Sequence, residues 1–245
     1  MSGRPTNTDT GFRVCGLCCK RGSHQVLSGV DMDAQSGQIV GLVGANGAGK
    51  TTLFDVVCGL RSAGGKSVPC GIHVDRIAYL TQSITVPDAL RLGELAQLVF
   101  GLSDRMDAKA QMACHLSEKE LAKLTTLWDR RSNSCSYGEK RWFVLIIVLS
   151  TDADLYVLDE PTSGVDIEYR QYIWNAVRLI KQRGKIVIFS KHAASEIEDV
   201  CDHFYFLKDG RAHRFDSAHA FLLATNAKTL DAGFMNYLST HPIEV

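Results

Sequence analysis

Short apolar runs alternate along this chain with stretches in which apolar residues recur at helical spacing. The two helical stretches cover residues 51–59 and 167–181, and a glycine closes each of them. The apolar runs predict buried strands at 38–44, 76–82, 155–159 and 185–190. Strands that alternate with helices predict an α/β fold with a mostly parallel sheet and helices on both faces. In such sheets ligands bind at the carboxyl ends of the strands.

Two regions interrupt this alternation. Residues 84–135 show helical spacing without a strand pattern and predict a small helical insertion. Residues 204–215 predict a hairpin turned by Asp209-Gly210. The chain is thus expected to divide into a flexible N-terminal tail over 1–10, a domain over 11–225 and a C-terminal tail over 226–245.

Charge and hydropathy exclude several classes of protein. The 27 basic and 27 acidic side chains of the 245 residues cancel, so no bulk field directs the chain to nucleic acid or to an anionic membrane. The longest apolar run, 142–149, is far shorter than the ~20 residues of a spanning helix. The N-terminus carries no apolar signal-peptide core. We expect a cytosolic globular protein that binds anions only locally.

The eight cysteines lie mostly in apolar surroundings, which is typical of reduced thiols in a cytosolic protein. One cluster, Cys15-x-x-Cys18-Cys19, has two interpretations. It could hold a metal ion, but no second pair of ligands follows at a usable spacing. The surrounding FRVCGLCCK resembles a strand, so packing is the favoured interpretation.

A glycine-rich stretch, GANGAGKTT (44–52), follows the first predicted strand and precedes the first predicted helix. It satisfies G-x-x-x-x-G-K-[ST] through Gly44, Gly49, Lys50 and Thr51. Glycines let backbone N–H groups approach a phosphate, and the helix N-terminus adds its positive dipole end. A plain glycine-rich connection is the alternative. The strand-loop-helix context favours a nucleoside triphosphate site, with Lys50 near the β- and γ-phosphates and Thr51 on Mg²⁺.

Two adjacent carboxylates end the predicted strand 155–159, in the stretch DLYVLDEPTSGVD. If this strand lies beside the phosphate loop, Asp159 can hold magnesium or its water shell. Glu160 points elsewhere and can accept a proton from an attacking water, which makes it the candidate general base. The alternative is an acidic pair that merely solvates the strand end.

The order of these motifs resembles the ATP-binding cassette family, over about residues 12–215. GANGAGKTT resembles its Walker A motif, LYVLDE its Walker B motif with the catalytic glutamate, and SGVD (163–166) its D-loop. Gln82 falls at the Q-loop and His192 at the switch histidine. The resemblance implies a phosphate-loop core, an N-terminal antiparallel sub-sheet and a helical subdomain over about 84–135.

The resemblance also implies a set of site residues. The catalytic residues are Glu160 and His192. Mg²⁺ is assigned to Thr51, Gln82 and Asp159. The residues implied to bind ATP are Gly44, Asn46, Gly47, Ala48, Gly49, Lys50, Thr51, Thr52, Gln82, Ser136 and Gly138.

The family signature LSGGQ is altered in this chain. The matching stretch is CSYGE (135–139), which keeps Ser136 and Gly138 but has Tyr137 and Glu139 in place of glycine and glutamine. Because two cassettes of the family pair head to tail, Ser136 and Gly138 are expected to contact the γ-phosphate held by the other subunit. The following WFVLIIVL is unusually apolar, and we expect it to be buried.

The adenine end of the site departs from the family as well. Relatives often stack an aromatic side chain on the base from a loop upstream of Walker A. The matching stretch, CCKRGSHQVL (18–27), offers Lys20 or Arg21 in that place.

The resemblance implies a transport ATPase subunit, because the chain has one cassette and no expected membrane span. Its partners would be an integral membrane permease and a second cassette, identical or paralogous, and it would lie on the cytoplasmic face of the membrane. Two alternatives stay open. One is a non-transport cassette that acts on DNA or ribosomes, and the other is a regulatory module that closes on ATP without hydrolysing it.

Overall fold

A computed structural model of the chain describes residues 11–64, 71–101, 107–114, 116–193, 197–198 and 200–239. The expected tail 1–10, residues 102–106 and 115 of the expected helical insertion, and residues 240–245 of the expected C-terminal tail lie outside this part. The centre is a six-stranded sheet of order β4-β5-β6-β3-β7-β8. Its strands are β3 (Ile39–Val43), β4 (Ile77–Leu80), β5 (Leu155–Leu158), β6 (Ile186–Lys191), β7 (His203–Lys208) and β8 (Arg211–Phe215).

The four strands predicted from the apolar runs are confirmed, as is the mostly parallel sheet. Every neighbouring pair from β4 to β7 is parallel, and only β7 and β8 are antiparallel. The predicted turn of this hairpin is also confirmed. Asp209 and Gly210 have φ of 50° and 74°, the left-handed geometry that a two-residue hairpin turn requires.

A second, two-stranded antiparallel sheet precedes the main sheet. It consists of β1 (Phe12–Arg21) and β2 (His24–Ala34). The register shifts between Val14 and Leu17, where Gly16 has φ of 56°, so a bulge breaks the simple alternation of the strand. Because of this shift Cys19 is buried in the core while Cys15 is exposed.

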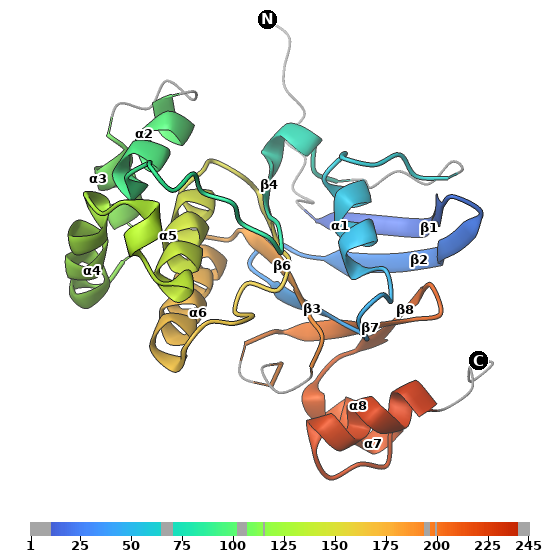
Figure 1. Cartoon of the computed structure of the whole chain (residues 1–245). Helices are drawn as coiled ribbons and strands as arrows, with labels where there is room; N and C mark the ends of the chain where they lie inside the picture. The colour runs from blue at the N-terminus through green and yellow to red at the C-terminus, as the bar shows by residue number, and fades with distance from the viewer. Residues whose placement is uncertain are drawn as a thin grey trace, which may run out of the picture.

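Period-two alternation divides the main sheet into two packed faces. In β6, Ile186 and Ile188 face a core that α1 (Lys50–Val57) and the β1–β2 sheet share. Val187 and Phe189 face the opposite core, which holds most of the other helices. Helix α1 therefore lies between the two sheets, as Figure 1 shows.

The region 84–135 is helical in its described part, with α2 (Leu92–Gly101), α3 (Ala108–Ala113) and α4 (Glu118–Trp128). Ser117 and Glu120 form a capping box that starts α4. The region packs beside α5 (Tyr137–Leu149) and α6 (Ile167–Gln182), away from β1 and β2 (Figure 1). Helix α5 buries Trp142, Phe143 and most of its remaining apolar residues, which confirms the expected burial.

The C-terminal stretch holds more order than a plain tail. Helices α7 (Ala218–Ala224) and α8 (Leu230–Ser239) pack together beside the main sheet (Figure 1). Rings of Phe206, Phe221 and Tyr237 meet there with centroids 4.5–6.0 Å apart. The stretch expected as a tail from residue 226 thus contains a packed helix, because its aromatic residues pack against Phe206 of β7 and Phe215 of β8. Within the described residues, no helix is both long enough and apolar enough to cross a bilayer.

Candidate functional site

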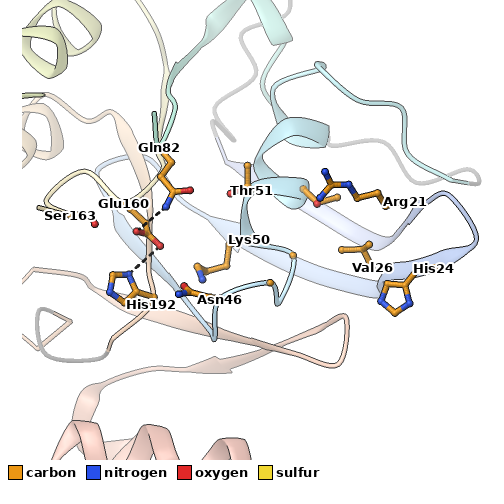
Figure 2. A pocket seen from close by; sticks show the side chains of 13 residues that line it. Arg21, His24, Val26, Asn46, Lys50, Thr51, Gln82, Glu160, Ser163 and His192 are labelled. Carbon is orange, nitrogen blue, oxygen red and sulfur yellow. Dashed lines mark hydrogen bonds and ion pairs between the residues drawn. The ribbon is translucent and has the colours of Figure 1, made fainter. Parts of the chain in front are cut away.

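A cavity of about 720 Å³ opens at the carboxyl end of β3. Its floor is formed by the turn between β3 and α1, through Asn46, Gly47 and Gly49, and by the first residues of α1, Lys50, Thr51 and Thr52. Figure 2 shows its two ends, which are formed by Gln82, Glu160 and His192 and by Arg21, His24 and Val26. The cavity thus runs from the β1–β2 sheet to the ends of the central strands.

The glycines of this turn are fixed by geometry. Gly47 and Gly49 have φ of 82° and 106°, a conformation that a side chain rarely adopts. A Cβ on Gly49 would lie 2.9 Å from Cγ1 of Val26, and one on Gly44 would lie 2.6 Å from the carbonyl oxygen of Leu207. The chain therefore turns here through backbone alone, and α1 begins at once at Lys50. Such a turn leaves the N–H groups of the first helical turn free to bind an anion.

Lys50 supplies the fixed positive charge of this cradle. Its side chain points into the cavity (Figure 2) and its Nζ donates hydrogen bonds to the carbonyl oxygens of Gly44 at 2.7 Å and Ala45 at 3.1 Å. Burial lowers the pKa of Lys50, and the carboxylates of Glu160 and Asp159 oppose that shift. A cation held this way is available to phosphate oxygens without moving far.

Asp159 joins the strand end to the phosphate loop. It is 1% exposed, and its Oδ2 accepts a 2.7 Å hydrogen bond from the hydroxyl of Thr51. The hydroxyl of Ser190, at the end of β6, donates to Oδ1 of the same carboxylate. A hydroxyl and a carboxylate at one place are the oxygen donors that suit Mg²⁺.

Glu160 has a left-handed backbone, with φ of 48°. This costs ~1–2 kcal/mol for a residue with a side chain, so the surroundings must hold it. Its N–H donates to Oγ of Ser190 at 2.9 Å. The carboxylate that results points at two side chains: Oε2 accepts from Nε2 of Gln82 at 3.3 Å, and Oε1 lies 3.2 Å from Nδ1 of His192. Sequence motifs far apart in the chain therefore meet at one carboxylate.

Arg141 is a residue of this site that sequence reasoning missed. It lies in α5, is 1% exposed, and donates to backbone carbonyl oxygens only. The acceptors are those of Thr81, Gln82, Asp159, Glu160 and Pro161, at 2.7–3.3 Å. One buried guanidinium thus ties the strained Glu160 to the loop of Gln82. The signal in the sequence was a lone arginine at the start of an apolar helix, where a buried cation needs such partners.

Comparison with known proteins identifies the family. The family model "ABC transporter" matches residues 27–163. The chain is 30% identical to protein McbF of Escherichia coli, over 83% of this chain and 84% of McbF. This chain belongs to the ABC transporter family. Membership implies that it binds nucleotide and hydrolyses ATP.

Other relatives of this ABC chain carry transport names. It is 33% identical to Nod factor export ATP-binding protein I of Burkholderia lata, over 82% of this chain and 69% of that protein. It is 26% identical to ribose import ATP-binding protein RbsA of Bacillus licheniformis, over 78% of this chain and 41% of RbsA. A solved ATP-binding subunit of an ABC transporter shares the fold, with a TM-score of 0.79 and 20% identity over 94% of this chain and 99% of that one.

Two of the expected nucleotide-binding residues, Gly44 and Ala48, and the expected Mg²⁺ ligand Asp159 do not line the cavity. Gly44 and Ala48 shape the turn, and Asp159 lies behind Thr51. Ser136 and Gly138 are not brought to the cavity of this ABC chain, since they lie at the N-terminus of α5. The two expected signature residues therefore lie apart from the phosphate loop of the same chain.

The end of the cavity beside β1 and β2 has more residues than the sequence reasoning considered. Arg21 lines the cavity as expected, but so do His24 and Val26, whereas Lys20 is exposed and outside the lining. The imidazole of His24 supplies a flat ring in the stretch 18–27, which has no Phe, Tyr or Trp.

Proposed function

We propose that this chain is the ATP-hydrolysing subunit of an ABC transporter and that it acts with a separate membrane-spanning partner. The observation that carries the proposal is the carboxylate of Glu160, which contacts both Gln82 and His192 at one end of the cavity. A carboxylate held at that end lies where the terminal phosphate of a nucleotide would sit if its base lay at the other end. Family membership supports the same reaction.

The turn between β3 and α1 binds the triphosphate. Lys50 provides the counter-charge, and the backbone around Gly47 and Gly49 provides hydrogen-bond donors. Asn46 and Thr52, which also line the cavity, add side-chain contacts. The base lies toward Arg21 and His24.

Thr51, Asp159 and Gln82 would hold Mg²⁺. The hydrogen-bonded pair of Thr51 and Asp159 offers oxygen donors beside the phosphate loop, and the side-chain oxygen of Gln82 is available while its nitrogen contacts Glu160. When bound, the ion neutralises charge on the phosphate oxygens.

Glu160 is the general base of hydrolysis. It takes the proton of a water whose oxygen attacks the γ-phosphorus, while the bond from that phosphorus to the oxygen of the ADP leaving group breaks. His192 orients the carboxylate through its Nδ1. The left-handed backbone of Glu160, held by Ser190 and Arg141, keeps the base aimed at the cavity.

The subunit works as a pair. Ser136 and Gly138 of one cassette contact the γ-phosphate bound by Lys50 of the other, which is either a second copy or a paralogue. Closure and reopening of the pair drive a permease that docks on the helical region 84–135. The chain is then peripheral on the cytoplasmic face of the membrane, and nucleic acid is not among its partners.

Co-purification with an integral membrane protein tests the transport part of this proposal. Leu98 of α2 and Leu223 of α7 are exposed apolar residues, 58% and 69% exposed, on opposite parts of the molecule. Leu98→Asp should abolish recovery of the membrane protein with the tagged chain, and the matched control Leu223→Asp should retain it. Recovery of no membrane protein with the parent chain contradicts transport. Steady ATP hydrolysis by the purified chain excludes a regulatory module that only closes on ATP.

A further inference from the structure

The altered signature places an acidic side chain at the start of α5. Glu139 closes a capping box: its Oε2 accepts a 2.7 Å hydrogen bond from the N–H of Ser136, and its own N–H donates to Oγ of Ser136 at 3.1 Å. Ser136 and Tyr137 on the same turn are exposed. The negative charge of Glu139 is therefore hydrogen-bonded to Ser136, the residue that is proposed to contact a phosphate.

An arginine from the helical region meets this carboxylate. Nη1 of Arg130 lies 3.0 Å from Oε1 of Glu139, whose side chain is 14% exposed, and Nη2 of Arg130 donates to the carbonyl oxygen of Ser134. The backbone of Arg130 is fixed as well, since its carbonyl oxygen accepts a 3.0 Å hydrogen bond from the N–H of Leu92. The guanidinium is thus held in place by contacts on several sides.

A second carboxylate, that of Asp166, lies near the signature turn and increases the need for the ion pair between Arg130 and Glu139. Asp166, the N-cap of α6, lies close to Gly138: a Cβ added to this glycine would be 3.1 Å from Oδ2 of Asp166. Oδ1 of Asp166 accepts a 3.0 Å hydrogen bond from the N–H of Tyr169. Without Arg130, the carboxylates of Glu139 and Asp166 would both add negative charge near the signature turn. Negative charge near this turn opposes the approach of a further anion.

We propose that Arg130 neutralises Glu139 so that the altered signature can receive the triphosphate bound by a second copy of this chain. The inference rests on the proposed function, because it needs two cassettes to close on ATP. Arg130 acts through Glu139 and does not itself have to contact the nucleotide. In this chain an ion pair takes the place of the neutral glutamine of the family signature.

A charge series tests the proposal in a Glu160→Gln background, in which hydrolysis is removed and ATP-dependent association can be measured by sedimentation. The parent pair is neutral, Arg130→Met leaves one negative charge, Glu139→Gln leaves one positive charge, and the double variant is neutral again. The amide oxygen that replaces the carboxylate can still accept the hydrogen bond from Ser136, so the cap of α5 is kept. Arg131→Met, which removes the same charge from an exposed neighbour, is the matched control.

We expect Arg130→Met to weaken association by about tenfold at about 50 mM salt and by only about twofold at about 500 mM, because salt screens the repulsion between the unpaired carboxylate and the incoming triphosphate. Glu139→Gln should associate at least as tightly as the parent. The double variant should return to within about twofold of the parent, since the charge that Arg130 compensates is gone. Arg131→Met should stay within about twofold of the parent throughout, because screened surface charges contribute little.

If Arg130→Met weakens ATP-dependent association equally with and without Glu139→Gln, the inference is overturned. It is also overturned if the weakening of association by Arg130→Met does not depend on salt. An equal loss in the Arg131→Met control would overturn it too, because general surface charge would then explain the effect. A parent that binds a fluorescent ATP analogue but never associates would contradict the proposed pairing of two copies, and this inference with it. Association of the parent together with an unaffected Arg130→Met variant removes the inference alone.

Discussion

The hydroxyl of Thr51 donates a 2.7 Å hydrogen bond to the carboxylate of Asp159, 108 positions later in the chain. Thr51 lies in the first turn of α1, which follows β3, and Asp159 directly follows β5. The strands β3 and β5 are not neighbours in the sheet, since β6 lies between them. Ser190 at the end of β6 completes the link through its hydroxyl. The phosphate loop and the strand of the two carboxylates are therefore connected before any ligand arrives.

Glu160→Gln is expected to retain ATP binding and lose most hydrolysis. The amide can accept a hydrogen bond from water but cannot take its proton, and losing a general base typically costs ~10²–10⁴-fold in rate. Phosphate release and ATP-dependent association measure the two effects. The same chemical change at an exposed position, Glu118→Gln, serves as the control. Hydrolysis by Glu160→Gln at the parent rate would rule out Glu160 as the base.

Complementation tests the composite site. Lys50→Ala removes the counter-charge of the phosphate loop, and Ser136→Arg blocks the signature, so each chain alone should be inactive. A mixed dimer concentrates both defects in one site and leaves the other intact. Mixing the two variants should therefore restore part of the ATP hydrolysis. Mixed dimers that form but stay inactive would contradict head-to-tail pairing.

The base end of the cavity predicts weak discrimination between nucleotides. Arg21 offers a cation and His24 offers a flat ring at this end of the cavity. A cation or a ring that contacts the face of a base does not distinguish adenine from guanine. ATP and GTP should therefore bind with similar affinity. His24→Ala should weaken both about fivefold if stacking on the ring contributes ~1 kcal/mol, the low end for base stacking. Titration with both nucleotides checks this, and a hundredfold preference for ATP would require another residue that reads adenine.

Arg141→Met should destabilise the protein and inactivate it. The change leaves buried carbonyl oxygens of Gln82, Asp159 and Glu160 without their donor and releases the strained backbone of Glu160. We expect a loss of ~3 kcal/mol in the free energy of unfolding, measured in urea. Arg91, which is exposed, provides the control, and Arg91→Met should change stability by less than ~0.5 kcal/mol. Equal effects of the two variants would contradict the role assigned to Arg141.

The stability of the domain should fall below about pH 6.5, partly through His203. Burial, assisted by the charge of Arg214, lowers the pKa of this histidine, which lies 3.3 Å from the carbonyl oxygen of Asp33. As the pH falls through the ordinary histidine pKa, the unfolded chain binds a proton that the folded chain does not, so acid favours unfolding. His203→Gln should flatten the loss of unfolding free energy between pH 7 and pH 5, although His213, whose pKa is also lowered, keeps part of it. Identical pH profiles of variant and parent would contradict this assignment.

Local pattern was enough to predict the four strands from the apolar runs, the helices α1 and α6 and the turn at Asp209-Gly210. These elements follow from side-chain periodicity and from the few residues that tolerate a left-handed backbone, both of which are properties of neighbouring positions. The phosphate loop was equally predictable, because the spacing of its glycines and Lys50 is a motif of neighbouring positions, and Gly47 and Gly49 adopt the left-handed backbone that glycine favours. The order of the motifs along the chain then indicated the family.

Contacts between segments far apart in the sequence could not be predicted from the local sequence pattern. The placement of His24 and Arg21 at the base end depends on how the β1–β2 sheet packs over α1. The burial of Arg141 depends on α5 lying against the ends of β4 and β5, and helix α8 packs where its aromatic side chains meet those of β7 and β8. A hydrogen bond or an ion pair such as Arg130–Glu139 needs two groups within a few ångströms, and only the packing of whole elements sets that distance.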